Sequence, residues 1–180
     1  MKGIVFTEFI ELVETKFGEQ MVDDLLDNAN LPSGGIYTAV GTYDHQEIVT
    51  LVSDLSQRTS VPVPDLLKTY GRFLFGRFTV LYPEFLQGHT SAFDFLEAVE
   101  GYIHVEVRKL YENAELPTFE TSRPDSHTLE MIYRSSRHFE DLAEGLISGC
   151  LNHFDLECSI HREPLNAAGD TLFRIVESHG

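Results

Sequence analysis

Hydrophobic residues recur every three or four positions through most of the first half of the chain, a spacing typical of helices with one buried face. Gly- and Pro-containing breaks at Leu31–Gly35 and Leu86–Gly88 interrupt this pattern. The pattern predicts helices over Val5–Phe17, Gln20–Asn28, His45–Ser56 (with Asp44 as its cap), a long stretch from Pro64 to just before Pro83, and Ala92–Tyr111 (with Thr90 or Ser91 as its cap).

The character of the sequence changes after Pro117. The segment Thr118–Asp125 contains Pro124 and is expected to be a polar connection. Beyond it, the pattern predicts a strand around Leu129–Tyr133, a helix over His138–Phe154, and two further strands at Leu156–Arg162 and Thr171–Ser178. The fold class is therefore α+β: a helical N-terminal lobe, then a strand–helix–strand–strand lobe with an antiparallel sheet.

Composition narrows the class of protein. The 180 residues are 42% hydrophobic, enough for the core of one domain. A formal net charge of −16 argues against nucleic acid or an anionic membrane as the main partner. No signal peptide or membrane-spanning run is visible, and the only cysteines are Cys150 and Cys158. We expect a cytoplasmic protein.

One polar motif stands out, because Tyr133, Ser135 and Arg137 are spaced two apart. In an extended segment this spacing places two hydroxyl groups and a guanidinium on one side, a donor set suited to a carboxylate. Upstream, His104 lies on a predicted helix with an apolar stripe, where a neutral imidazole can bind iron. A ligand with acidic groups and a metal that accepts nitrogen fits both features, and haem is such a ligand.

The chain resembles the haem–nitric oxide/oxygen binding (H-NOX) family, which is related to the haem domain of soluble guanylate cyclase. The resemblance covers nearly the whole chain and implies one H-NOX domain over residues 1–180, with a helical lobe over about 1–60 and a haem-anchoring lobe over about 61–180. Haem b would be buried between the lobes. The residues that carry the resemblance are Met1–Gly3, Gly71-Arg72, Phe85–Phe95, His104, Pro117 and the Tyr133-x-Ser135-x-Arg137 motif.

The resemblance also assigns roles to individual residues. His104 would be the axial ligand of the haem iron. Tyr133, Ser135 and Arg137 would hold the two propionates, and a guanidinium suits this task because it offers a rigid pair of donors. Pro117 matches a family proline that presses on the macrocycle.

The other side of the haem bears on which gas is bound. Family members that hold oxygen use a distal tyrosine, and its position falls on Leu142 here, while two supporting positions fall on Phe9 and Leu74. An apolar pocket without a donor favours nitric oxide over oxygen, because bound oxygen carries partial negative charge. The other expected lining residues are Val5, Phe78 and Leu146.

The expected function is therefore non-enzymatic sensing of nitric oxide, with carbon monoxide as a second ligand. No nucleophile motif, phosphate loop or paired carboxylates suggest catalysis, so no catalytic residue is assigned. By the resemblance, the output partner is a separate histidine kinase or cyclic-di-GMP enzyme in a bacterium.

A second cluster leaves an alternative open. Cys150-x-x-His153 and Cys158-x-x-His161 offer sulfur and imidazole ligands for zinc, or a thiol pair for redox sensing. Cys158 and His161 would lie on opposite faces of a regular strand, so a zinc site there needs a bend. The alternative function is a redox or zinc-dependent sensor.

Overall fold

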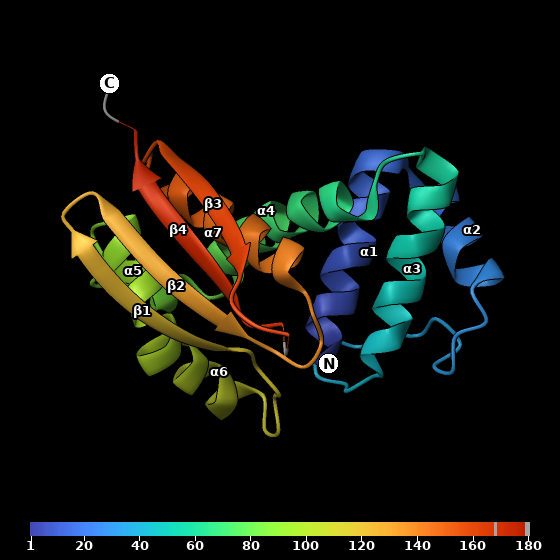
Figure 1. Cartoon of the computed structure of the whole chain (residues 1–180). Helices are drawn as coiled ribbons and strands as arrows, with labels where there is room; N and C mark the ends of the chain where they lie inside the picture. The colour runs from blue at the N-terminus through green and yellow to red at the C-terminus, as the bar shows by residue number, and fades with distance from the viewer. Residues whose placement is uncertain (168, 179–180) are drawn as a thin grey trace.

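The computed structural model of the chain describes residues 1–167 and 169–178. Figure 1 shows a four-stranded sheet on one side of the molecule and α1, α2 and α3 on the other, with α4 reaching between them. The helices are α1 (Gly3–Phe17), α2 (Glu19–Asn28), α3 (His45–Thr59), α4 (Val63–Leu81), α5 (Ala92–Ala98), α6 (His104–Leu110) and α7 (Glu140–His153), with a 3₁₀ turn η1 (Pro83–Leu86) and a π-helical turn η2 (Val99–Ile103). The strands are β1 (Thr118–Asp125), β2 (Thr128–Arg134), β3 (Cys158–Pro164) and β4 (Thr171–Glu177).

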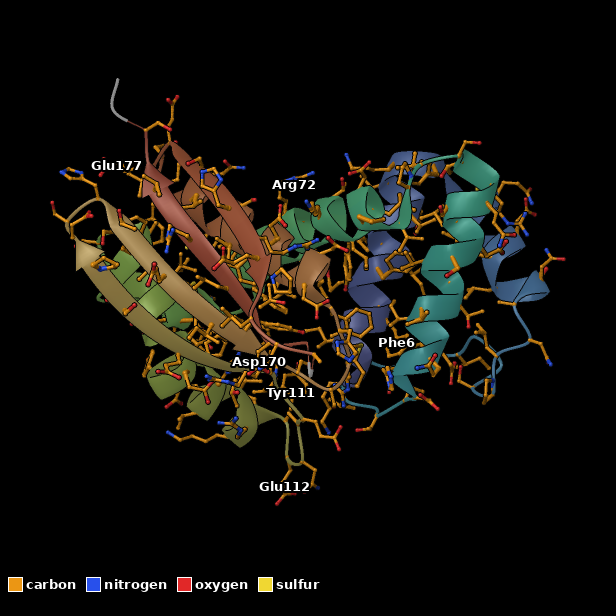
Figure 2. The ribbon with its side chains drawn as sticks, in the orientation of Figure 1. Phe6, Arg72, Tyr111, Glu112, Asp170 and Glu177 are labelled. Carbon is orange, nitrogen blue, oxygen red and sulfur yellow. The ribbon has the colours of Figure 1, made fainter. Side chains whose placement is uncertain are left out.

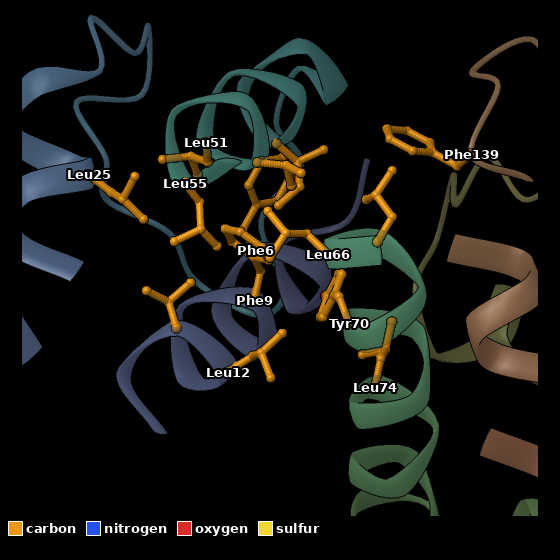
Figure 3. Close-up of a cluster of buried hydrophobic side chains, with 14 of the residues drawn as sticks. Phe6, Phe9, Leu12, Leu25, Leu51, Leu55, Leu66, Tyr70, Leu74 and Phe139 are labelled. Carbon is orange, nitrogen blue, oxygen red and sulfur yellow. The ribbon is translucent and has the colours of Figure 1, made fainter. Parts of the chain in front are cut away.

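The apolar faces of α1, α3 and α4 form one hydrophobic core (Figure 3). Phe6, Phe9 and Leu51 are almost completely buried within it. Tyr70 on α4 is also fully buried, and its hydroxyl donates a hydrogen bond to the carbonyl oxygen of Val5 on α1. This bond satisfies the only polar atom of a side chain that otherwise packs as an apolar one.

The start of α1 is fixed against the loop before α3. The amide of Gly3 donates to the carbonyl oxygen of Gly41 at 2.8 Å. A Cβ atom on Gly3 would lie 1.8 Å from the carbonyl oxygen of Thr38, so a side chain at this position would collide with the backbone. Position 3 therefore requires glycine for the loop to pack this closely.

The sheet is antiparallel with strand order β1-β2-β4-β3. Burial alternates along β2, and Leu129, Met131 and Tyr133 face the covered side. These side chains pack with residues of α5 and α7, including Phe95 and Ile147, in a second hydrophobic core. The sheet is thus covered on one face by two helices.

Helix α7 packs closely against α4. A Cβ atom on Gly71 of α4 would lie 2.4 Å from the carbonyl oxygen of Leu142, and one on Gly145 of α7 would lie 2.3 Å from that of Lys68. The two backbones can approach so closely only because neither glycine has a side chain. This contact sets where the cavity-facing residues of both helices lie.

The predicted α+β class is confirmed, and so are the helices in the first half. As predicted, Asp44 caps α3, because its carboxylate accepts from the amide of Gln46 at 2.9 Å. Ser91, one of the two expected caps of the next helix, accepts from the amide of Asp94 at 3.2 Å.

Two predictions were wrong in detail. Thr118–Asp125 is not a connection but strand β1, so the second lobe is strand–strand–helix–strand–strand. β1 is an edge strand that pairs only with β2, which explains why it lacks an alternating apolar pattern and tolerates Pro124. The predicted helix Ala92–Tyr111 is helical, but the π-helical turn η2 divides it immediately before His104.

Candidate cofactor site

A cavity of about 890 Å³ lies between the sheet, α6 and the helices α1, α4 and α7. Its lining is mostly apolar, with polar side chains from the end of β2 and the segment before β1. Tyr111 and Asp170, labelled in Figure 2, line it where the sheet meets the N-terminal helices. The volume suits an organic cofactor, since small-molecule sites are typically apolar cavities of roughly 300–1,000 Å³.

His104, the first residue of α6, is the only histidine that lines the cavity in the described part of the chain. Its side chain is buried, and its Nδ1 lies 3.2 Å from Oε2 of Glu100, one turn earlier. Burial lowers the pKa of His104, while the hydrogen bond to Glu100 acts in the opposite direction. The net lowering favours the neutral imidazole, the form that binds metals.

Tyr133, Ser135 and Arg137 all line the cavity, although they do not share one extended segment. Strand β2 ends at Arg134, so Ser135 and Arg137 belong to the turn that follows it. The Ser135 hydroxyl accepts from the amide of Arg137 at 3.2 Å, which holds this turn together. The strand end and the turn, rather than strand alternation, bring the three side chains together.

The Tyr133 hydroxyl accepts a hydrogen bond from the amide of Phe139 at 3.3 Å, and the ring is almost fully buried. Burial raises the pKa of Tyr133, and the hydrogen bonds with Ser135 and the Phe139 amide partly oppose this. Tyr133 is therefore a neutral hydrogen-bonding group at ordinary pH.

Arg137 is held against the segment that precedes β1. Its Nη1 donates to the carbonyl oxygen of Glu115 at 3.1 Å, and its Nη2 pairs with the Glu115 carboxylate. The Arg137 side chain is only 15% exposed, whereas that of Glu115 is 81% exposed. The guanidinium is thus a partly buried cation on the cavity wall whose acidic partner lies in solvent.

Three further hydroxyl groups on the cavity wall form hydrogen bonds within the protein. Tyr82 pairs with Tyr111, and the Thr79 hydroxyl donates to the carbonyl oxygen of Gly76 at 2.8 Å. Burial, followed by the contact with Tyr111, raises the pKa of Tyr82. The wall formed by α1, α4 and α7 is otherwise apolar, with Val5, Leu74, Phe78, Leu142 and Leu146 in the lining.

A family model described as Haem-NO-binding matches residues 2–162, most of the chain. The chain belongs to the H-NOX family. Among curated proteins, no match to this H-NOX chain was found.

Solved structures of other H-NOX proteins have the same fold. The unliganded Fe(II) protein from K. algicida is 39% identical, with a TM-score of 0.93 over 100% of this chain and 98% of that one. The IWP-051-bound Fe(II)CO protein from Shewanella woodyi is 41% identical, with a TM-score of 0.85 over 99% and 95%. The Fe(II)NO protein from S. oneidensis is 25% identical, with a TM-score of 0.92 over 99% and 100%.

The residues on the cavity wall of this H-NOX protein fit the haem for which the family is described. An imidazole on one helix can ligate iron, and a partly buried guanidinium with two hydroxyl-bearing neighbours can hold carboxylates. The rest of the wall is apolar, as a porphyrin requires. Pro117 also lines the cavity, between α6 and β1.

All the residues expected to contact haem line the cavity except Phe9. Phe9 is 1% exposed within the helical core, and its ring packs edge-on against that of Tyr70 at 5.3 Å. The helical spacing placed Phe9 on the buried face of α1, but that face contacts the core over part of its width and the cavity over another part.

The structure does not bring the predicted zinc ligands together. Among residues 1–167 and 169–178, no group of three or more His, Cys, Asp or Glu side chains is placed to hold a metal ion. Cys150 is buried with its Sγ directed at the Ala92 carbonyl oxygen, 3.9 Å away, while His153 and His161 are exposed. Burial raises the pKa of Cys150 to about 12 and that of Cys158 to about 11, which disfavours the thiolate that zinc binding or redox chemistry needs.

Three residues at the site were not singled out from the sequence: Tyr82, Tyr111 and Glu115. Both tyrosines immediately follow helices, and helix ends carry no periodic signal that marks a cavity.

Within the described part of the chain, no helix has the length and apolar character to cross a bilayer.

Proposed function

We propose that this H-NOX protein is a non-catalytic sensor that binds nitric oxide at ferrous haem, forms no stable oxygen complex, and regulates a separate signalling protein. His104 would ligate the iron of haem b, and Tyr133, Ser135 and Arg137 would hold its propionates. The bound haem supplies an iron centre that takes up diatomic gases. H-NOX structures in NO- and CO-bound states support these gases as ligands, with carbon monoxide second.

The observation that carries the gas preference is the lack of a free donor on the apolar wall. Leu142 and Leu74 occupy this wall. The tyrosines that line the cavity among the described residues come from other segments: Tyr133 lies on β2, and Tyr82 and Tyr111 directly follow the last residues of α4 and α6. A hydrogen-bond donor would stabilise bound oxygen, which carries partial negative charge, far more than bound nitric oxide. A wall without one therefore favours nitric oxide.

The protein's own residues can also transmit a change at the iron. His104 begins α6, and Pro117 follows that helix before β1, so both lie in one continuous stretch of the cavity wall. A change in the position of His104 would move α6 relative to the sheet, a shift of the kind that signalling proteins present to a partner. By the family resemblance, that partner would be a histidine kinase or a cyclic-di-GMP enzyme in the bacterial cytoplasm.

The test is visible spectroscopy of the purified ferrous protein, recorded alone, with nitric oxide and with air. We expect a Soret band, a nitrosyl spectrum with nitric oxide, and no lasting oxygen complex in air. The His104→Gly variant should retain the cavity but lose the spectrum of histidine-ligated ferrous haem, and free imidazole should restore it. The absence of a Soret band after haem reconstitution would contradict haem binding, and a stable oxygen complex would contradict the gas preference.

The regulatory part has its own test. Autophosphorylation of a histidine kinase, or turnover by a cyclic-di-GMP enzyme, from the same organism should change when the wild-type protein is loaded with nitric oxide. The same change should be absent with the His104→Gly variant. Equal regulation by both proteins would exclude the route through His104.

A further inference from the structure

One carboxylate oxygen connects His104 to the sheet. Oε2 of Glu100 lies 3.2 Å from Nδ1 of His104 and accepts a hydrogen bond from the backbone amide of Phe119 at 3.1 Å. Glu100 lies on the π-helical turn η2 and Phe119 lies on β1, so the contact joins two elements. The other oxygen of Glu100 faces Nη2 of Arg108 at 3.8 Å.

The hydrogen bond defines which nitrogen of His104 is available. A carboxylate accepts hydrogen bonds and donates none, so the proton of the neutral imidazole resides on Nδ1. The lone pair is then on Nε2, the nitrogen further from the backbone. A carboxylate at Nδ1 also makes the imidazole a stronger donor toward a metal.

The position of Glu100 depends on the π-helical turn. η2 spans Val99–Ile103 and ends directly before His104. Turns of this kind are rare within helices and often occur at functional sites, because the extra residue redirects the side chains that follow. Here the turn directly precedes His104, the only histidine on the cavity wall among the described residues.

The acceptor is fixed on the sheet side as well. The Phe119 ring packs on His104 at 5.9 Å between centroids and on Tyr133 at 5.6 Å. Phe119 follows Pro117 by two residues and is the second residue of β1. Glu100 therefore connects His104 to the backbone of Phe119, whose ring also packs on Tyr133.

We propose that Glu100 is a positioning residue for the cofactor: it sets the tautomer and ring orientation of His104, strengthens its donation to iron, and links it mechanically to β1. This inference rests on the proposed function of His104 as the iron ligand. It adds that the strength of the bond between His104 and iron depends on Glu100, whose carboxylate does not line the cavity.

The test compares Glu100→Gln and Glu100→Ala with a matched control, Glu106→Gln. Glu106 lies on α6, two residues after His104, and pairs with Lys109 at 2.6 Å. This control therefore removes one negative charge near His104 without removing a hydrogen bond to its imidazole. The first readout is the iron–histidine stretching band of the ferrous, unliganded protein in resonance Raman spectra. The second is the solvent exchange rate of the His104 Nδ1 proton in the diamagnetic ferrous CO complex, measured by NMR.

We expect Glu100→Ala to shift the stretching band to lower frequency, and to accelerate exchange of the Nδ1 proton and nitric-oxide-driven loss of the histidine ligand by about tenfold or more. Glu100→Gln retains an acceptor without the charge, so it should give a smaller shift in the same direction. The Glu106→Gln protein should match the wild type. If Glu100→Ala fails to fold, the stretching band and the exchange rate of the Glu100→Gln protein test the proposal.

Unchanged stretching bands and exchange rates in the Glu100 variants would overturn the proposal. A shift of equal size in Glu106→Gln would also overturn it, because the effect would then be one of general charge. A wild-type protein without an iron–histidine band would contradict the proposed function of His104 instead. The two failures are therefore distinguishable.

Discussion

The hydroxyl group of Tyr82 is hydrogen-bonded to that of Tyr111 at the edge of the cavity. Tyr82 directly follows the last residue of α4, and Tyr111 directly follows the last residue of α6. The Tyr82 ring also stacks on Phe85, with centroids 5.3 Å apart. The pair thus joins the end of the helix that begins with His104 to the end of a helix that forms the apolar wall.

We expect Tyr111→Phe to lower the free energy of unfolding by about 0.5–1.5 kcal/mol, the usual net contribution of one hydrogen bond. The Tyr82→Phe and Tyr111→Phe double variant should lose little more than either single variant, because both remove the same bond. Urea unfolding of the haem-loaded proteins measures this coupling.

Tyr102→Phe is the matched control, since that side chain is 41% exposed and does not line the cavity. It should change the free energy of unfolding by less than about 0.5 kcal/mol. Strictly additive effects of Tyr82→Phe and Tyr111→Phe would show that the hydroxyl pair contributes no coupling between α4 and α6.

The sequence predicted those elements whose pattern reflects burial on one face. β2 was found because Leu129, Met131 and Tyr133 alternate with polar residues and cover the second core. β1 was missed because an edge strand is stabilised by backbone pairing with β2, which leaves no alternating apolar trace. The other edge strand, β3, was predicted, so it is the missing apolar alternation of β1 and not its edge position that hid it.

The residues of the candidate site also fall into those that the sequence revealed and those that it did not. His104 and the Tyr133–Arg137 motif were found because each fits a haem contact by its chemistry and the two together match the pattern of the H-NOX family. Phe9 was expected at the cavity because the family resemblance puts a supporting position there. Its ring packs in the helical core instead, and matching a position does not show which way its side chain faces. The bond between Tyr82 and Tyr111 joins residues far apart in the chain, which only the folded structure brings together.

The apolar wall predicts the outcome of adding a donor to it. Leu142 lines the cavity from α7, and Leu142→Tyr would place a phenol there. A hydrogen bond to partly charged bound oxygen is worth about 1.5–3 kcal/mol, which corresponds to a gain in oxygen affinity of roughly tenfold to a hundredfold. Absorption spectra of the ferrous protein in air measure the gain.

Leu142→Phe adds the same ring without the hydroxyl and is the control for changes in shape. We expect no lasting oxygen complex with it. If both variants bind oxygen equally, the shape of the wall rather than its lack of a donor determines which gas is held.

Because α4 and α7 pack so closely, the stability of the fold should be sensitive to any side chain larger than glycine at their contact. In Gly145→Ala the new Cβ atom would lie 2.3 Å from the Lys68 carbonyl oxygen, so the two helices must separate. Overpacking of this kind costs about 1–3 kcal/mol. Gly76→Ala, on α4 with nothing within 4 Å, is the control and should be neutral or stabilising by up to about 1 kcal/mol. Equal unfolding midpoints for the two variants would contradict the close-contact argument.

The proposed role of the Arg137 guanidinium leads to a prediction about how firmly haem is held. Arg137→Lys keeps the charge but loses the paired donors, so we expect haem to dissociate about tenfold to a hundredfold faster. Transfer of haem to excess apomyoglobin measures the rate. Arg174→Lys, on an arginine that is exposed on β4 and pairs with Glu130, should leave the rate unchanged. Similar rates in the two variants would exclude Arg137 as a propionate anchor.

The two thiols predict how the protein responds to alkali and to alkylating reagents. Burial raises the pKa of Cys150 to about 12 and that of Cys158 to about 11, whereas an unfolded cysteine ionises near pH 8.5. Because the fold prefers the neutral thiols, their contribution to stability is fully present below about pH 8.5. It is lost as the pH rises from there toward the raised pKa values.

Only the thiolate reacts with iodoacetamide, so at pH 8 the folded protein should be alkylated more than about tenfold more slowly than the urea-unfolded protein. Mass spectrometry of each cysteine measures both rates. A Cys150→Ala and Cys158→Ala double variant should keep the wild-type spectral change with nitric oxide, because neither thiol lines the cavity. Rapid alkylation of the folded protein, or an altered response in the double variant, would restore the cysteines as candidate sensors. Slow alkylation with an unchanged response would leave gas sensing to the haem cavity.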